Sequence, residues 1–229
     1  ILDGKYQILV NPYPIFKHHY TIPSLTHTPQ SIDARIIDML KIAKDYAPYT
    51  IFYNGAHCGA SAPMHMHFQM VEGGLMPIED EWRECEERVL NDTMFDSKLS
   101  LLIGLHRPIF LITSYDEYGA KGLFDELYKV LPAQPDNEPM INVIARYEHS
   151  QWIILVFPRA KHRPDCYYAT DESQCLISPA SVEMGGLFIT PRQEDYEKIT
   201  SQKILDRYRE ITPSSDEIEN IAQQLYKTL

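Results

Sequence analysis

The most informative pattern of hydrophobic and polar positions is a strict alternation at residues 65–71. Two histidines and a glutamine alternate with apolar residues in the order His65, Met66, His67, Phe68, Gln69 and Met70. Because successive side chains of a β-strand point to opposite faces of its sheet, the pattern predicts a strand with one apolar and one polar face. We expect the apolar face to pack into the core and the polar face to carry the chemistry.

A second strand is predicted at Tyr49–Tyr53, directly before a loop that contains two glycines, a serine and a proline. Glycine and proline favour turns between strands. We therefore expect residues 54–64 to form the tip of an antiparallel hairpin whose returning strand is 65–71.

Strand-like and helix-like runs are mixed along the rest of the chain. An amphipathic helix is predicted from Ser31 to Pro48, because one helical stripe carries Ile32, Ile36, Met39, Leu40 and Ala43. Further strands are predicted at 5–11, 19–23, 109–113, 141–147 and 151–157, and further helices at 122–131, after Thr190 and after Ser214. The absence of regular β-α alternation predicts an α+β fold with an antiparallel sheet and flanking helices.

The run from Pro132 to Pro139, P-A-Q-P-D-N-E-P, is the best candidate linker because proline and polar residues crowd it. We therefore expect an N-terminal unit at 1–131, a linker at 132–140 and a C-terminal unit at 141–229. Because the sequence begins at Ile1 and runs directly into a strand-like stretch, we also expect residues in front of it.

Composition and charge narrow the classes of partner. With 44% apolar and 23% charged residues the sequence is typical of a soluble globular protein. The 32 acidic and 21 basic residues give a net charge of −11, which argues against nucleic acid as a partner. No run reaches the roughly 18–20 apolar residues of a membrane span. Four cysteines without a C-x-x-C pair indicate free thiols and a reducing, cytoplasmic compartment.

Two histidines in an H-x-H arrangement have three readings. They can be a structural pair satisfied by hydrogen bonds, or two ligands of a zinc ion. They can also supply a neutral imidazole that attacks phosphorus, with its second nitrogen held by a neighbouring acceptor.

Gln69 favours the third reading. A side-chain amide is a poor zinc ligand but a good donor to a phosphoryl oxygen. Gly55 and Gly59 let backbone N–H groups approach an anion closely, and Ser61 adds a hydroxyl donor. Donors beside a nucleophile predict phosphoryl chemistry, and we expect no metal on His65 and His67.

The segment resembles the histidine-triad superfamily, specifically its transferase branch, whose signature is H-x-H-x-Q. That branch includes galactose-1-phosphate uridylyltransferase, diadenosine tetraphosphate phosphorylase and GDP-L-galactose phosphorylase. Asn54 lies eleven residues before His65, and residues 11–23 read N-P-Y-P-I-F-K-H-H-Y-T-I-P, like the family's N-x-x-P-x-x-x-x-H-x-x-x-P segment. The runs N-V-I-A-R-Y-E-H-S-Q-W-I-I-L-V-F-P-R and V-E-M-G-G-L-F-I-T-P-R resemble the C-terminal half of the phosphorylases. Residues 72–108 and 200–229 carry no motif that matches.

The resemblance implies a histidine-triad-like fold of two similar halves and a two-step reaction. His67 would attack the α-phosphorus of a nucleotide and form a nucleotidyl-histidine, which a phosphorylated acceptor then discharges. His65 and Gln69 would support the phosphate, and Asn54 and Asn11 would contact the nucleotide near its ribose. The resemblance implies small-molecule substrates, a nucleotide and a phosphorylated acceptor, and no cofactor; the oligomeric state is left open.

Some residues have competing readings. Ser61 lies four residues before His65, whereas the family places its serine three before, where this chain has Ala62. Arg159 and Lys161 belong to a basic cluster that either binds phosphate or is a solvated turn. His19 reads as a buried, hydrogen-bonding residue at the start of a strand.

Three rival functions remain beside the nucleotidyltransferase or phosphorylase. A histidine-triad hydrolase would use water as acceptor, and Gln69 in place of a third histidine argues against it. A non-catalytic nucleotide-binding protein would keep the pocket without turnover. A structural metal protein would use the histidines as ligands.

Overall fold

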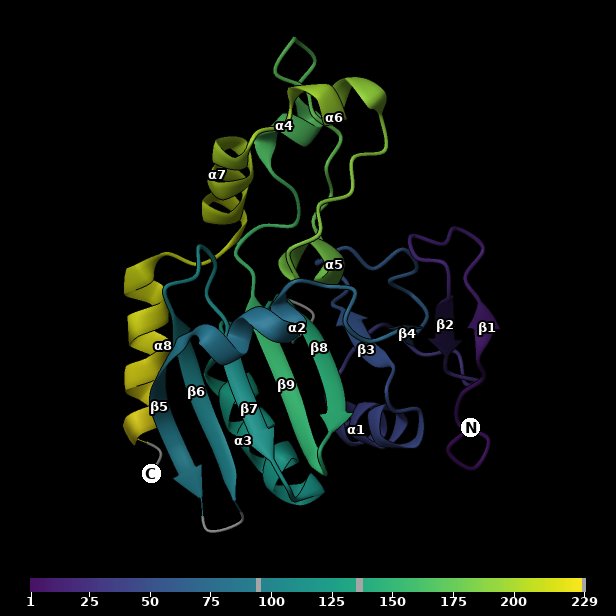
Figure 1. The fold of residues 1–229 in the computed structure, drawn as a ribbon, viewed down its shortest axis with the longest axis vertical. Coiled ribbons are helices and arrows are strands. Elements are labelled where there is room, and N and C mark those ends of the chain that lie inside the picture. Colours follow the sequence, from purple (N-terminus) through teal and green to yellow (C-terminus); the bar gives the residue numbers. More distant parts are fainter. Residues whose placement is uncertain (94–95, 135–137, 228–229) are drawn as a thin grey trace.

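The structure, a computed structural model, describes residues 1–93, 96–134 and 138–227 (Figure 1). Its strands form one nine-stranded sheet in the order β1-β2-β4-β3-β8-β9-β7-β6-β5, with antiparallel neighbours throughout. The strands are β1 (Leu9–Val10), β2 (His19–Pro23), β3 (Thr50–Asn54), β4 (His67–Val71), β5 (Glu86–Thr93), β6 (Ser97–Ile103), β7 (Phe110–Ser114), β8 (Ile141–Glu148) and β9 (Gln151–Pro158).

The helices are α1 (Ile36–Asp45), α2 (Ile78–Glu81), α3 (Glu117–Val130), α4 (Asp165–Tyr168), α5 (Ser181–Met184), α6 (Gln193–Lys198), α7 (Ser201–Ile211) and α8 (Ser215–Lys227), with a 3-10 turn at Trp82–Glu84. Helices flank an antiparallel sheet, so the predicted α+β class is confirmed. No helix in the described residues is long and apolar enough to cross a membrane.

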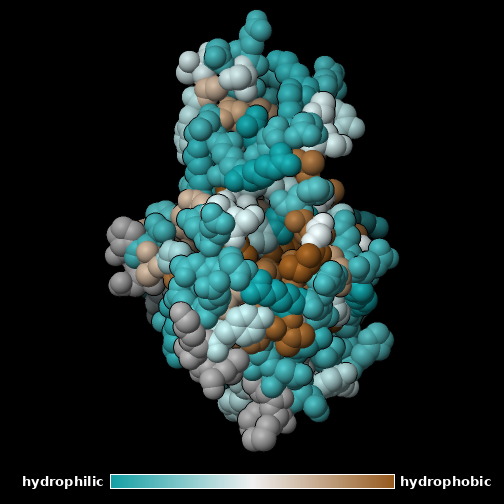
Figure 2. Space-filling view, turned by 90° about the vertical axis from the view of Figure 1, so that its left-hand side faces the viewer, coloured by the Kyte–Doolittle hydropathy of each residue, from teal (hydrophilic) through white to brown (hydrophobic). Residues whose placement is uncertain are grey.

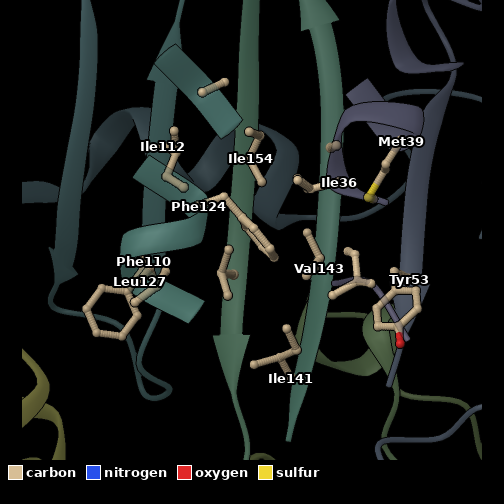
Figure 3. Close-up of a cluster of buried hydrophobic side chains, with 14 of the residues drawn as sticks. Ile36, Met39, Tyr53, Phe110, Ile112, Phe124, Leu127, Ile141, Val143 and Ile154 are labelled. Atoms are coloured by element: carbon tan, nitrogen blue, oxygen red, sulfur yellow. The ribbon is translucent and has the colours of Figure 1, made fainter. Parts of the chain in front are cut away.

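One face of the sheet carries the larger core. Helices α1, α3 and α8 pack against this face, and their apolar stripes meet alternate residues of the strands. Figure 3 shows Phe124 of α3 among side chains of the central strands, with Met39 of α1 beside them. The predicted apolar face of the alternation is confirmed, because Met66, Phe68 and Met70 are all buried in this core.

The opposite face carries a second apolar cluster, which includes Phe52, Val71 and Ile144 and extends to α2, α5 and α7. Helices α4, α6 and α7 rise above this body as a separate lobe (Figure 1). Seen from the side of α8, the lobe is mainly hydrophilic, and exposed apolar side chains gather below it (Figure 2). His67 and Gln69 alternate with the core residues, so their side chains point to this second side of the sheet.

Several element boundaries differ from the sequence-based predictions. The first strand is only Leu9–Val10, and α1 begins at Ile36 because Ala34 adopts a left-handed φ of 55° that a helix from Ser31 cannot contain. The strand of the alternation begins at His67, because the His65 backbone N–H donates to Ala62 O and closes a turn. Strands β5 and β6 and helix α7 lie in regions where no element was predicted.

The strands of the predicted N-terminal unit lie on both sides of the β8–β9 hairpin, which belongs to the predicted C-terminal unit. Strand β8 pairs with β3, and β9 pairs with β7. One continuous sheet therefore joins the two units. Residues 135–137 of the predicted linker lie outside the described residues, and the division at 132–140 stays a prediction.

Candidate active site

His67 is held in one tautomer by the backbone beside it. Its ring is buried, and Nδ1 lies 2.8 Å from the carbonyl oxygen of His65. A carbonyl oxygen can only accept, so Nδ1 carries the proton and donates it. The lone pair is therefore on Nε2, which is the arrangement that a nucleophilic imidazole needs.

Burial also keeps the His67 ring uncharged. Desolvation disfavours the imidazolium and lowers the pKa of His67 from 6.5, while the hydrogen bond to the His65 carbonyl raises it in part. At neutral pH the ring is consequently neutral, and Nε2 is available to attack an electrophile.

His65 is fixed by the segment at 24–27. Its Nε2 donates to the carbonyl oxygen of Ser24 at 2.8 Å, and its Nδ1 lies 3.3 Å from Nδ1 of His27. The two rings meet edge to face, with centroids 4.8 Å apart. In this arrangement His65 orients His67 through its backbone carbonyl, and its own ring nitrogens already have partners. The sequence interpretation missed His27, because no spacing links it to the alternation.

Gln69 points toward the 11–19 loop. Its Oε1 accepts a hydrogen bond from His19 Nε2 at 2.7 Å and a longer one from Asn11 Nδ2 at 3.4 Å. His19 is buried and hydrogen bonded, as the sequence indicated. The structure thus brings the amide group of Asn11 into contact with Gln69.

Asn54 is buried at the end of β3, and its side-chain oxygen accepts two hydrogen bonds. Asn142 Nδ2 donates at 2.9 Å, and the backbone N–H of Ser181 donates at 2.8 Å. With its oxygen occupied, Asn54 offers a ligand its NH₂ group. A ribose hydroxyl or ring oxygen is a suitable acceptor.

Arg159 supports Asn54 indirectly, because it holds Asn142, which donates to Asn54. Its guanidinium is buried, and Nη1 donates to Asn142 Oδ1 at 2.7 Å and to Pro179 O at 2.9 Å, while Nη2 donates to backbone oxygens of the next turn. The reading as a solvated turn does not fit this buried residue. Lys161 instead pairs with Asp165 and with Glu210 at the lobe.

The glycine loop is shaped by close packing. Gly59 has a φ of 93°, and a Cβ at this position would lie 2.5 Å from Cβ of Ala180. A left-handed φ and this contact both require glycine. Ser61 is exposed on the same loop, and Gly55 lies against Ile141 O, which a Cβ would approach to 2.9 Å.

Gln30 joins the two strands that carry Asn54 and His67. Its Nε2 donates to Asn54 O at 2.8 Å and to His67 O at 3.0 Å, and its Oε1 accepts from the His67 backbone N–H at 2.9 Å. The β3–β4 pairing ends at Phe52 and Gln69, so Gln30 takes the place of the next rung. The backbones of His67 and Asn54 are thereby kept at a fixed separation.

Cavities also lie away from the core. One of 460 Å³ is lined by Ser24, Thr26, Thr28 and Arg35, among others, and shares Ser24 with the His65 network. Another of 690 Å³ lies between the β6–β7 connection and the start of α8, far along the sheet from β4. Within the described residues no cluster of three His, Cys, Asp or Glu side chains is placed to hold a metal ion.

Comparisons with known proteins match two parts of the chain to family models. Residues 1–72 match the family model of a domain of unknown function, DUF4922, and residues 124–229 match the GDPGP1-like C-terminal domain. No curated protein sequence matches the chain.

Two solved structures share the fold. The structure of yeast Ap4A phosphorylase Apa2 in complex with AMP is 18% identical, covers 92% of this chain and 73% of its own, and has a TM-score of 0.66. A DUF4931 family protein from Bacillus cereus is 13% identical, covers 96% of both chains, and has a TM-score of 0.51.

The fold and the C-terminal match confirm the resemblance to the transferase branch of the histidine-triad superfamily. The chain is similar in fold to yeast Ap4A phosphorylase Apa2 and, over residues 124–229, to the GDPGP1-like C-terminal domain.

Proposed function

We propose that the protein is a nucleotidyltransferase or phosphorylase that works through a nucleotidyl-histidine on His67. The supporting observation is the tautomer of His67, in which the hydrogen bond from Nδ1 to the His65 carbonyl leaves the lone pair on a neutral Nε2. The substrates are a dinucleoside polyphosphate or a nucleoside diphosphate sugar together with a phosphorylated acceptor.

In the first step, Nε2 of His67 donates its electron pair to the α-phosphorus of the nucleotide. The phosphorus–oxygen bond to the phosphate-bearing leaving group breaks, and that group leaves with the bonding electrons. The positive charge that develops on the ring is stabilised by the Nδ1–H donor bond to the His65 carbonyl, which strengthens as the ring becomes cationic.

In the second step, an anionic oxygen of phosphate or of a sugar phosphate attacks the same phosphorus. The phosphorus–nitrogen bond breaks, and its electrons return to Nε2. The NH₂ group of Gln69 is suited to hold a phosphoryl oxygen in both steps, and Asn54 is suited to hold the ribose. Gly59 and Ser61, on the same loop, are further candidates for contact with the phosphates, and a bound metal is not required on His65 and His67.

The test is covalent labelling with a base-labelled nucleotide donor. Wild type should acquire an acid-labile label, and His67→Ala should acquire none, because no other side chain carries the attacking nitrogen. His65→Ala should retain part of the labelling, since His65 acts chiefly through a backbone carbonyl that alanine keeps. The matched control is His18→Gln, which changes a half-buried histidine paired with Glu72. Label retained at this site in His67→Ala contradicts the proposal.

The hydrolase is the second candidate, and the acceptor decides between the two. Gln69 cannot take up or release a proton near neutral pH, so it cannot activate water. Phosphate or a sugar phosphate should therefore discharge the labelled enzyme far faster than buffer alone. A label lost to water as fast as to every phosphorylated acceptor would establish the hydrolase instead.

The metal content of the purified protein tests the remaining alternative, a structural metal protein. Both ring nitrogens of His65 have partners within the chain, so stoichiometric zinc bound by His65 and His67 would need a rearranged site. Elemental analysis of the purified protein, with His67→Ala as comparison, should find no such zinc. A cytoplasmic location stays a prediction from the four free cysteines.

A further inference from the structure

The loop at 11–19 ends in two donors that meet on one atom, Oε1 of Gln69. Asn11 follows β1 directly and is the first residue of the loop, and His19 begins β2. From Asn11 to His19 the chain reads N-P-Y-P-I-F-K-H-H, and its two prolines have no backbone N–H. Two of the N–H groups that remain decide the orientation of both donors.

The first of these groups fixes Asn11. The backbone N–H of Tyr13 donates to Asn11 Oδ1 at 2.9 Å, which closes an Asx turn. Since the oxygen of the carboxamide is engaged, the NH₂ group is the end that remains, and it points to Gln69 Oε1.

The second group fixes His19. The backbone N–H of Ile15 donates to Nδ1 of His19 at 3.1 Å, so Nδ1 must carry the lone pair. The proton of the neutral ring is then on Nε2, which donates to Gln69 Oε1 at 2.7 Å. Burial lowers the pKa of His19 from 6.5, which keeps the ring in this neutral, single-donor form.

We propose that His19 and Asn11 are positioning residues that fix the rotation of the Gln69 carboxamide. By occupying Oε1 with two donors, they leave the NH₂ group as the end that faces the reacting phosphoryl group. This inference rests on the proposed function and adds to it a reason why the amide points one way.

The orientation matters because a carboxamide has a donor end and an acceptor end of nearly the same shape. A flipped Gln69 would present its oxygen to a phosphoryl oxygen, and two acceptors repel each other. Loss of a transition-state donor costs about 10²–10³ in rate. A free amide would divide its time between the two rotations, whereas a held amide does not.

The decisive experiment compares two substitutions of the same residue by single-turnover labelling. Asn11→Ala removes one weak donor and should slow labelling only about twofold to fivefold. Asn11→Asp is nearly isosteric and can still accept from Tyr13. However, it places an oxygen where Nδ2 was, 3.4 Å from Gln69 Oε1 and 3.3 Å from His19 Nε2.

That oxygen attracts the His19 proton and the Gln69 NH₂ group, and so favours the flipped amide. We expect Asn11→Asp to be slower than Asn11→Ala by about tenfold or more, and to approach Gln69→Met. A loss confined to the maximal rate, with little change in the donor concentration at half-saturation, is expected. Asn11→Asp equal to or faster than Asn11→Ala overturns the proposal.

A second pair tests His19. His19→Phe keeps a ring against Phe16 and Phe52 but removes the donor, while His19→Gln offers an NH₂ group to Gln69 Oε1. Labelling should fall in His19→Phe and recover in part in His19→Gln, with His18→Gln unchanged. Equal losses in both variants would indicate a merely structural role. If His19→Phe does not fold, the Asn11 pair still decides.

A measurement that needs no substrate separates this inference from the proposed function. Long-range ¹H–¹⁵N spectra of wild type should show His19 protonated on Nε2 and bare on Nδ1, and an Nδ1–H tautomer overturns the positioning role. Failure of the proposed function would appear differently, as wild type that forms no label with any nucleotide donor.

Discussion

Gln69 and Asn54 are two carboxamides held by their oxygen atoms, but the donors that hold them come from different parts of the chain. Gln69 is held by Asn11 and His19, which lie with it in the region that matches DUF4922. Asn54 is held by Asn142 and Ser181, both in the region that matches the GDPGP1-like C-terminal domain. The proposed phosphate end of the site is thus built within one region, whereas the proposed nucleoside end depends on contact between two.

The largest effect is expected at Gln69 itself. Gln69→Met keeps the length of the side chain and removes the donor, so single-turnover labelling should slow by about 10²–10³. Asn54→Ala should instead raise the nucleotide concentration at half-saturation, with a smaller change in maximal rate. Rapid-quench labelling over a range of donor concentrations measures both. The proposed difference between Gln69 and Asn54 is contradicted if both variants change the maximal rate and the half-saturating concentration in the same way.

Gln69→His tests whether position 69 controls the choice of acceptor. An imidazole can exchange a proton near neutral pH and an amide cannot, so the share of label lost to water should rise. The measurement is the product ratio at fixed phosphate, and Gln69→Met serves as control because it adds no acid or base. An unchanged ratio in Gln69→His would show that position 69 does not control the acceptor.

The next effect concerns the support of Asn54. Asn142→Ala frees the Asn54 carboxamide and deprives Arg159 Nη1 and Cys58 O of a partner. We expect about tenfold weaker nucleotide binding, by titration calorimetry, and a loss of about 1–3 kcal/mol in the free energy of unfolding.

Ser181→Ala is the matched control for Asn142→Ala. It removes the bond from Ser181 Oγ to Tyr53 O but keeps the Ser181 backbone N–H that holds Asn54. It should lower stability without weakening nucleotide binding. Weakening as large as in Asn142→Ala would mean that Asn142 affects the site only through stability.

A smaller effect follows from the lowered pKa of His67. The neutral ring is the nucleophile, so the labelling rate should stay level from pH 8 to 6.5 and fall at a lower pH, where the ring becomes protonated. A dinucleoside polyphosphate is the suitable donor, because it has no terminal phosphate that titrates in this range. A rate that already falls above pH 6.5 would contradict the lowered pKa.

The effect expected at Glu183 is on stability; its carboxylate accepts from the Ala180 backbone N–H next to Ser181. Burial raises the pKa of this carboxyl from 4.5 to about 7. A raised pKa favours the protonated native state below 4.5, and this stability is lost as the pH rises through about 7.

Glu183→Gln should remove this dependence. Wild type should lose up to about 2–3 kcal/mol in free energy of unfolding between pH 5 and pH 8 from this group, and the variant should lose less. Urea unfolding at the two pH values measures the difference. Parallel losses in both proteins would show that Glu183 does not titrate in this range.

The sequence could predict features that depend on a local pattern, but not those that depend on contacts between distant segments. The alternation at 65–71 predicted the core face, because a period of two is local and β4 follows it. The site residues on the other face stay a prediction. The predicted contact of Asn11 with the nucleotide stays a prediction, and the hydrogen bond from its amide to Gln69 was not foreseen from the sequence. The roles of His27 and Arg159 depend on partners that meet only in the folded sheet, and no spacing along the chain encodes them.

The amide of Gln30 acts as a spacer of one peptide unit inserted between two strand ends. It offers a donor and an acceptor in the geometry of a backbone rung, and so sets the distance between His67, the proposed nucleophile, and Asn54, which is proposed to bind the nucleoside. The distance between His67 and Asn54 is therefore set by the side chain of Gln30, which would not contact the substrate. A glutamate at this position would keep the acceptor but lose the donor, and the two carbonyl oxygens that Gln30 now joins would drift apart. The distance between His67 and Asn54 would then vary, and the site would no longer select substrates by their length.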